Sequence, residues 1–409
     1  MIIDLSDTNA SAIASALVRA RRSAGSPAMG MVLTLIIVAD EHSHYDAIRA
    51  AMQAAKEHPS RIIGVIPQAG RGPARLDAEV RVGGEGGPGE SLLLRLYGEL
   101  SHHPESVVTP LLLPESPVVT WWPGKAPSAP SADPLGALAQ RRITDCSAAR
   151  HPLAELQQRC QTYAPGDTDL AWTRITPWRA LLAAALDQPH GMISGATIEA
   201  ERANASADLL GAWLSWRLRI PVTVKQSAGP GITAARLHTE DGDIAIDRTD
   251  GRVARYSIPF QPERTVALKR RETSELLAEE LRRLDPDEIY ARTVQELLRT
   301  ASETADQVLL SPGEPSAEKA ERPARKRAAK KQAASDVGAE HGGRRTAAKT
   351  AKKATAKAPA AKGAAKKAAK KSAAKKTTAK KATGRTSTTR AGGGAKRAAS
   401  TGRRGREES

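Results

Sequence analysis

The chain has 409 residues, with 62 Lys and Arg against 45 Asp and Glu and a formal net charge of +17. Residues 311–409 hold 29 of the basic and 7 of the acidic side chains, so residues 1–310 are mildly acidic. Cys146 and Cys160 form no C-x-x-C pair and have no His at a zinc spacing, which argues against a disulfide framework or a structural metal.

The N-terminal segment argues against export and membrane insertion. It carries Asp4 and Asp7 where a secretory signal would carry positive charge. The apolar stretch 29–39 is too short to span a bilayer and is better explained as a buried strand. We therefore expect a cytoplasmic protein that does not contact a membrane.

The first part of the chain predicts an α/β domain. In chain order the apolar patterns predict a helix over 11–22, a strand over 31–39, a helix near 43–57, strands over 61–66, 75–82 and 91–98, a helix near 104–113 and a strand over 117–122. The continuous apolar runs are typical of parallel strands covered on both faces. The alternating pattern of 75–82 adds a hairpin to this α/β order.

The second part predicts an α+β domain with an antiparallel sheet. A Pro- and Ser-rich loop at 123–134 and short helices around 134–140 and 151–161 lead to the sequence YAPGDTD, where we place a domain boundary. Beyond it the patterns predict helices over 177–187 and 206–218, strands over 221–226, 232–239, 243–248 and 252–258, a helix over 274–284, and a last helix capped by Asp285 with Pro286 in its first turn. The expected domains are 1–165, 166–310 and a tail at 311–409.

The tail lacks the residues of a hydrophobic core, so we expect it to be disordered. The AAKK-like repeats over 346–384 would neutralise the phosphates of a nucleic acid without contacting specific bases, which predicts non-specific contact with nucleic acid. A solubilising, self-repelling tail is the alternative.

The sequence GEGGPG at 84–89 fits the spacing G-x-G-x-x-G of a dinucleotide site. That site requires a helix directly after the glycines, whereas the following residues, ESLLLRLYG, predict a strand. We therefore expect a glycine-rich hairpin loop. No Walker A sequence, G-x-S-x-G elbow or H-E-x-x-H helix occurs in the chain, so we expect no cofactor and no metal.

The tryptophans gather in two short segments. Trp121 and Trp122 end a predicted strand, where one indole can enter the core while the other stands at the end of the sheet. The second indole is explained either by packing or as an anchor for a sugar ring or a partner protein. In residues 165–188, Trp172 and Trp178 suit packing around a helix that starts at Pro177.

A charged cluster accompanies the second segment. Asp167, Asp169, Arg174 and Arg179 would lie together near the helix start. Capping and ion pairing explain them better than acid/base catalysis, because nothing nearby supplies a nucleophile or a cofactor cradle.

Several segments together resemble the OpcA family, the glucose-6-phosphate dehydrogenase assembly proteins. The likeness spans most of residues 1–300 and is carried by KEHPSRII (56–63), RLYGEL (95–100), VVTWWPG (118–124), RITD (142–145), YAPGDTDLAW (163–172), RITPWRALLAAALDQP (174–189) and RRETSELLAEELRRLDPDEIY (270–290). The tail is instead similar to the Lys/Ala-rich extensions of histone-H1-like proteins. Redox control through cysteines is associated with some members, but Cys146 and Cys160 match no motif that carries it.

The resemblance implies a non-catalytic partner that promotes assembly or activation of glucose-6-phosphate dehydrogenase, the NADP-dependent enzyme opening the oxidative pentose phosphate pathway. Trp and Arg are the residue types that anchor interfaces. We therefore predict a partner interface bordered by eight residues: Trp121, Trp122, Asp167, Asp169, Trp172, Arg174, Trp178 and Arg179. Two alternatives remain, an enzyme acting on sugar phosphates or glycosides through Asp167 and Asp169, and a nucleic-acid-binding protein.

Overall fold

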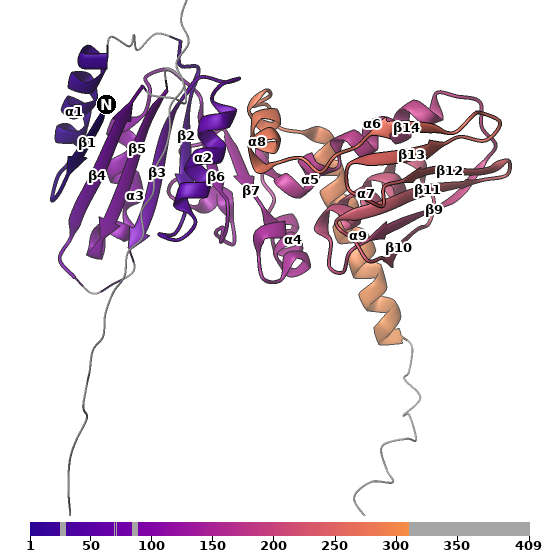
Figure 1. Ribbon diagram of the computed structural model, residues 1–409. Helices are drawn as coiled ribbons and strands as arrows, with labels where there is room; N and C mark the ends of the chain where they lie inside the picture. Colours follow the sequence, from indigo (N-terminus) through magenta and orange to yellow (C-terminus); the bar gives the residue numbers. More distant parts are fainter. Residues whose placement is uncertain (25–29, 69, 71, 84–88, 311–409) are drawn as a thin grey trace, which may run out of the picture. The chain divides into compact units, whose positions relative to one another are not determined.

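The computed structural model describes residues 1–24, 30–68, 70, 72–83 and 89–310 (Figure 1). The tail predicted to be disordered, at 311–409, lies outside the described residues. The boundary expected between residues 165 and 166 stays a prediction.

The first sheet confirms the α/β prediction for the N-terminal region. Among the described residues it has eight strands in the order β1-β4-β5-β3-β2-β6-β7-β8. Strands β5, β3, β2, β6, β7 and β8 are mutually parallel, while β4 runs antiparallel to β5 and β1 antiparallel to β4. The strands are β1 Ile2–Leu5, β2 Leu33–Val38, β3 Ser60–Gln68, β4 Arg75–Val82, β5 Glu90–Tyr97, β6 Val118–Trp122, β7 Arg141–Thr144 and β8 Asp167–Asp169.

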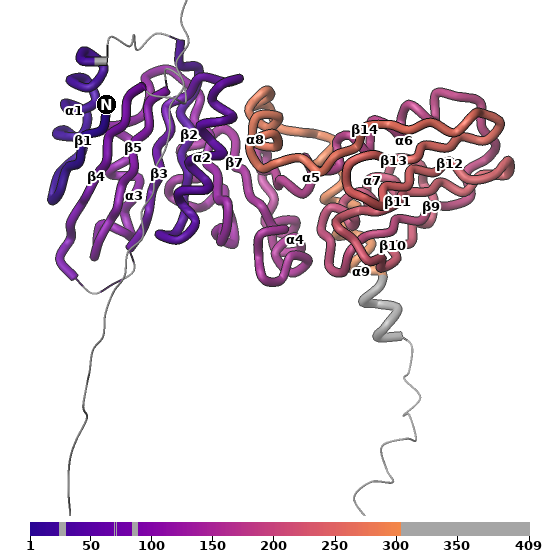
Figure 2. The backbone as a smooth tube through the Cα atoms, in the orientation of Figure 1, coloured from indigo at the N-terminus to yellow at the C-terminus, as the bar shows by residue number. Residues whose placement is uncertain are grey.

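Helices cover both faces of this sheet because its central strands are apolar on both sides. In β2, Leu35 packs with α2 (His44–Ala54), whereas Ile36 packs with α1 (Ala10–Ala24). This is the alternation expected of successive strand residues. Helix α3 (Pro104–Val108) joins the α1 face, and α8 (Thr273–Leu281) packs beside α2 although it is far away in sequence, as the tube in Figure 2 also shows.

The second sheet is mixed, which corrects the expected antiparallel sheet. Its order within the described residues is β10-β9-β11-β12-β13-β14, and only the pair β9 and β10 is parallel. Helix α7 (Ala205–Leu218) forms the crossover that joins these two strands, as parallel pairing requires. The strands are β9 Ile193–Ala200, β10 Val222–Gln226, β11 Ile232–Thr239, β12 Gly242–Asp247, β13 Val253–Ser257 and β14 Arg264–Ala267.

One apolar core joins this second sheet to the remaining helices. It contains Trp172, Trp178, Leu209 and Ile246, all at most 2% exposed. Helix α7 packs against β9 and β10 and against the last helix. The helices of this region are α4 Pro152–Gln161, α5 Leu170–Arg174, α6 Thr176–Leu186 and α9 Glu288–Leu310. Short 3-10 turns lie at Gly98–His102 and Thr109–Leu111 beside the first sheet, and at Pro130–Ala132 and Cys146–Ala148.

Two local predictions were wrong. Residues 134–140 form turns and not a helix, although Asp133 Oδ1 accepts the N–H groups of Leu135 and Gly136 as a helix cap would. Gly136 inside the segment disfavours a helix. The last helix begins at Glu288, and its cap is Asp287 rather than Asp285.

The glycine-rich sequence at 84–89 joins two strands. Residues 84–88 lie outside the described residues, but β4 and β5 pair antiparallel on either side, with Val82 opposite Glu90. The predicted strand after the glycines is thereby confirmed, and the helix that a dinucleotide site needs does not follow them.

No helix in the described part of the chain is long and apolar enough to cross a lipid bilayer.

Candidate functional site

The two carboxylates of strand β8 hold the backbone together. Asp167 forms an ion pair with Arg142 and accepts the N–H of Ala164 at 2.9 Å. Burial raises the pKa of Asp167, although the Arg142 bond opposes this shift. The carboxylate therefore fixes the turn that leads into β8.

Asp169 is completely buried and accepts four hydrogen bonds. Its Oδ1 accepts from the N–H of Ala171 at 2.8 Å and the thiol of Cys146 at 3.2 Å, and its Oδ2 accepts from Thr144 Oγ1 at 2.6 Å and the N–H of Cys146 at 2.9 Å. Asp169 thus caps α5 and ties it to the turn after β7. These contacts match the expected capping role.

The four predicted interface tryptophans lie inside the protein. Trp121, Trp122, Trp172 and Trp178 are each at most 2% exposed. Both indoles of the WW pair are buried, so the expectation that one stands at the end of the sheet as an anchor does not describe its position. A surface bordered by these segments stays a prediction.

The arginines of the same segment differ in their partners. Arg174 forms a bidentate ion pair with Asp145, with both N–O distances 2.7 Å, and its side chain is 29% exposed. Burial raises the pKa of Asp145, and the Arg174 bonds oppose this. Arg179 lies over the Trp172 ring at 3.7 Å, a cation–π contact, and has no carboxylate partner among the described residues.

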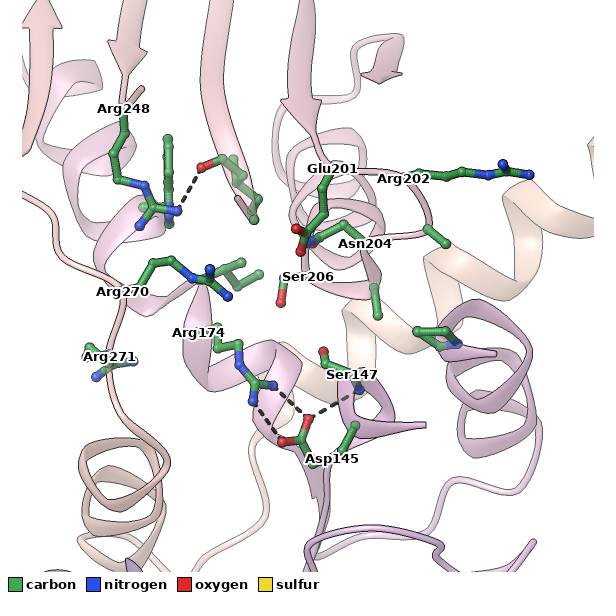
Figure 3. Close-up of a pocket in the computed structure, with 18 of the residues that line it drawn as sticks. Asp145, Ser147, Arg174, Glu201, Arg202, Asn204, Ser206, Arg248, Arg270 and Arg271 are labelled. Atoms are coloured by element: carbon green, nitrogen blue, oxygen red, sulfur yellow. Dashed lines mark hydrogen bonds and ion pairs between the residues drawn. The ribbon is translucent and has the colours of Figure 1, made fainter. Parts of the chain in front are cut away.

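A pocket of about 360 Å³ lies beside the first turn of α7 (Figure 3). The turn after β7, the junction of α5 and α6, the start of β11 and the segment between β14 and α8 contribute its other walls. Six cationic side chains and two carboxylates line it. The cations are Arg174, Arg202, Arg248, Lys269, Arg270 and Arg271, and the carboxylates are Asp145 and Glu201.

Half of these cations are neutralised by carboxylates. Arg174 pairs with Asp145, Lys269 Nζ lies 2.6 Å from Glu275, and Arg271 pairs with Glu279. The other three, Arg202, Arg248 and Arg270, have no ion-pair partner within the described residues. The pocket is therefore positively charged.

Arg248 is the unusual member because it is only 5% exposed. Its Nη1 and Nη2 donate to the carbonyls of Leu268 at 3.1 Å and Ile232 at 2.7 Å, and its Nε has no partner. Burial lowers the pKa of Arg248 to about 10, and the neighbouring Arg270 adds to the shift. The guanidinium also lies over the Trp178 ring at 4.9 Å.

Gly231 keeps the space between two guanidinium groups open. A Cβ on this residue would lie 3.5 Å from Arg248 Nη2 and 3.9 Å from Arg270 Nε. Its φ of +66° also favours glycine. Both nitrogen atoms therefore flank the same point of the pocket wall.

The cysteines are free, buried thiols. Burial raises the pKa of Cys146 well above its usual value, and Asp169 adds to the shift; burial raises the pKa of Cys160 to about 12. Both thiols are therefore protonated near neutral pH, unlike reactive cysteines. Within the described ranges, no group of three or more His, Cys, Asp or Glu is placed to hold a metal.

The pocket could not be predicted from the sequence alone. Arg248 and Arg270 stand 22 positions apart and meet only through the pairing of the second sheet. The one local signal in the sequence is the run of cations at 269–271.

Fold and pocket together define a protein with an α/β sheet, a second mixed sheet and a cation-rich pocket. Two adjacent family models match it, described as the N-terminal and C-terminal domains of a glucose-6-phosphate dehydrogenase subunit, over residues 51–161 and 165–294. The chain belongs to the OpcA family, as its sequence segments indicated.

A curated relative and solved structures were also found. A Synechocystis sp. protein named as the OxPP cycle protein OpcA is 30% identical over 156 residues, which is 35% of this chain. The chain spans about a third (32%) of the length of that relative. The 3-ketoreductase KijD10 from Actinomadura kijaniata is 9% identical with a TM-score of 0.39, covering 66% of this chain and 97% of that one. An oxidoreductase domain protein from Kribbella flavida is 8% identical, also at 0.39, covering 68% and 98%. Likeness at this level carries no argument about function.

Proposed function

We propose that the chain binds glucose-6-phosphate dehydrogenase and promotes its active oligomer without catalysing a reaction itself. The observation that carries this proposal is the match of two adjacent domains, described as parts of a subunit of that enzyme, over 51–161 and 165–294. A binding protein can shift an assembly equilibrium only by its differential affinity for the assembled form. We therefore propose that the contact surface is complete only on the assembled dehydrogenase.

The contacts of Asp167 and Asp169 favour this role over the alternative enzyme. Asp167 is neutralised by Arg142. Asp169 is completely buried and accepts four hydrogen bonds. A catalytic carboxylate must reach the reacting atoms of a substrate. Neither group has that access.

The proposed interface includes the surface beside the WWPG sequence. Lys125 follows it directly and is exposed, and Arg174, in the second predicted interface segment, is partly exposed. Charged rim residues mainly change the rate of association. We expect Lys125→Glu to slow binding to the dehydrogenase, while Lys225→Glu, at another exposed position on β10, leaves it unchanged.

The test is to mix the purified chain with glucose-6-phosphate dehydrogenase from the same organism. Sedimentation velocity reports the oligomer size, and NADPH formation reports the rate. We expect a larger enzyme species and a higher rate at saturating concentration. If neither quantity changes, the proposal is wrong.

Contact of the tail with nucleic acid stays a prediction from composition. Comparing the full chain with residues 1–310 for retention on DNA separates the two activities. We expect the shorter chain to lose DNA retention and to keep its effect on the dehydrogenase, because the two domain matches end at residue 294.

A further inference from the structure

The pocket beside α7 has the features of an anion site. Arg248 is buried without a carboxylate partner, and Arg270 reaches into the same space (Figure 3). Like charges this close repel each other, so an anion between them would lower the energy of both. Arg202 lines the same pocket but points away from it (Figure 3).

Polar groups complete the other side of the pocket. The N–H groups of Ala205 and Ser206 in the first turn of α7 have no acceptor among the described residues, as is usual for a helix start. The helix has 14 residues, so its N-terminal end favours negative charge. Glu201 and Asn204 also line the pocket and are bonded to each other at 3.1 Å.

The carboxylates that face the pocket do not neutralise it. Asp145 is held by both N–H bonds of Arg174, and Glu201 is a single charge opposite two unpaired cations, Arg248 and Arg270. A hollow of about 360 Å³ suits a small molecule, since small-molecule sites begin near this volume. A protein side chain would fill only a part of it.

We propose that this pocket binds a small phosphorylated metabolite, with its phosphate group held between Arg248 and Arg270. Guanidinium groups present paired donors that match phosphate oxygens, and Nη1 and Nη2 of Arg248 each carry a second N–H beyond the one donated to a carbonyl. Glu201, Asn204 and Ser147 supply acceptors and donors for hydroxyl groups on the rest of the molecule. This site does not depend on the proposed role with the dehydrogenase.

Calorimetric titration of the full chain tests the proposal with three probes. Inorganic phosphate presents the group alone, glucose 6-phosphate presents it with hydroxyls, and glucose presents hydroxyls alone. We expect saturable one-to-one binding of at least one phosphate-bearing probe and none of glucose. Comparing the two phosphate-bearing probes decides whether free phosphate or a phosphate ester is the ligand.

The decisive variant is Arg270→Ala. Arg270 is an exposed residue, and its side chain bonds to no other described group, so its removal leaves the fold intact. We expect its affinity for the phosphate-bearing probe to fall at least about tenfold, the loss of one charge-assisted hydrogen bond. Arg202→Ala is the matched control and is expected to bind as the unchanged chain does.

The basic tail also attracts phosphate, but it is identical in the unchanged chain and in the two variants. Its contribution therefore cancels when their affinities are compared. Added salt of about 0.2 M weakens binding to exposed charges more than binding in a pocket. The proposal is overturned if no probe binds saturably, or if Arg270→Ala binds as tightly as Arg202→Ala. It is also overturned if Arg270→Ala weakens only the complex with the dehydrogenase, since the pocket would then take a partner's carboxylate.

Discussion

The indole Nε1 of Trp172 donates a hydrogen bond to Asp287 Oδ2 at 2.8 Å, which joins α5 to the start of α9. The other oxygen of the same carboxylate accepts the N–H groups of Ile289 and Tyr290 at 2.9 and 3.0 Å. One side chain therefore caps the last helix and satisfies a buried indole. The Trp172 segment is held by its own chain and does not need a partner for its polar atom.

Replacing Asp287 should destabilise the fold. In Asp287→Ala the helix loses its cap, worth about 0.5–2 kcal/mol, and the indole N–H of Trp172 loses its acceptor, worth about 1–3 kcal/mol. We expect the free energy of unfolding to fall by roughly 2–4 kcal/mol in urea titrations. Asp285→Ala is the matched control, because its side chain is exposed and Arg141 uses only its carbonyl. Equal losses in both variants would contradict the assignment of the cap.

The sequence could predict elements with strong periodicity and could not predict those whose buried residues are polar. The strand expected over 75–82 matches β4, and the helix over 206–218 matches α7 closely. Strand β7 was missed because it begins with Arg141 and Arg142, which sequence patterns place on the surface. Both arginines are instead buried in ion pairs, with Glu280 and Asp167.

Strand β9 was missed for a different reason. Its sequence ISGATIEA is rich in small residues with weak strand preference, and it is defined by pairing with β10 and β11. The pocket depends on the same long-range pairing, which brings Arg248 and Arg270 to Gly231. No local pattern contains that information.

Asp169 provides a test between a structural and a catalytic carboxylate. In Asp169→Ala the donors of Thr144 and Cys146 lose a buried acceptor, so we expect a loss of stability on the order of 3 kcal/mol or more. Thr168→Val is the neighbouring control, because the Thr168 hydroxyl is buried without a partner and its removal should be neutral or stabilising. Unfolding midpoints in urea measure both. An Asp169 variant that keeps its stability but loses turnover of a sugar phosphate would favour the alternative enzyme.

Asp208 predicts a dependence of stability on pH. Burial raises the pKa of this carboxyl in α7 from 3.8 to about 6. The folded state therefore binds the proton more tightly than the unfolded state, and this favours folding at low pH. The advantage is lost as the pH rises from about 4 to about 6, and above that range the charged carboxylate destabilises the fold.

Asp208→Asn removes this charge while keeping the shape of the side chain. We expect the variant to be more stable than the unchanged chain at pH 8, by up to about 3 kcal/mol, and to show little difference at pH 4. Thermal unfolding at both pH values measures the effect. Asp46→Asn is the control, because that side chain is 80% exposed and should show no such gain. A gain of equal size at pH 4 would mean that the cause is not the ionisation of Asp208.

The two thiols should resist alkylation in the folded protein. Burial raises the pKa of Cys160 to about 12 and that of Cys146 well above its usual value, so very little thiolate exists at pH 8. Each side chain is also only 3% exposed, which restricts the approach of a reagent. We expect iodoacetamide to leave both cysteines unmodified in native protein and to modify both in urea, as measured by mass spectrometry. Rapid modification of either residue without denaturant would reveal an accessible thiolate and would contradict this prediction. That cysteine would then be a candidate for redox control.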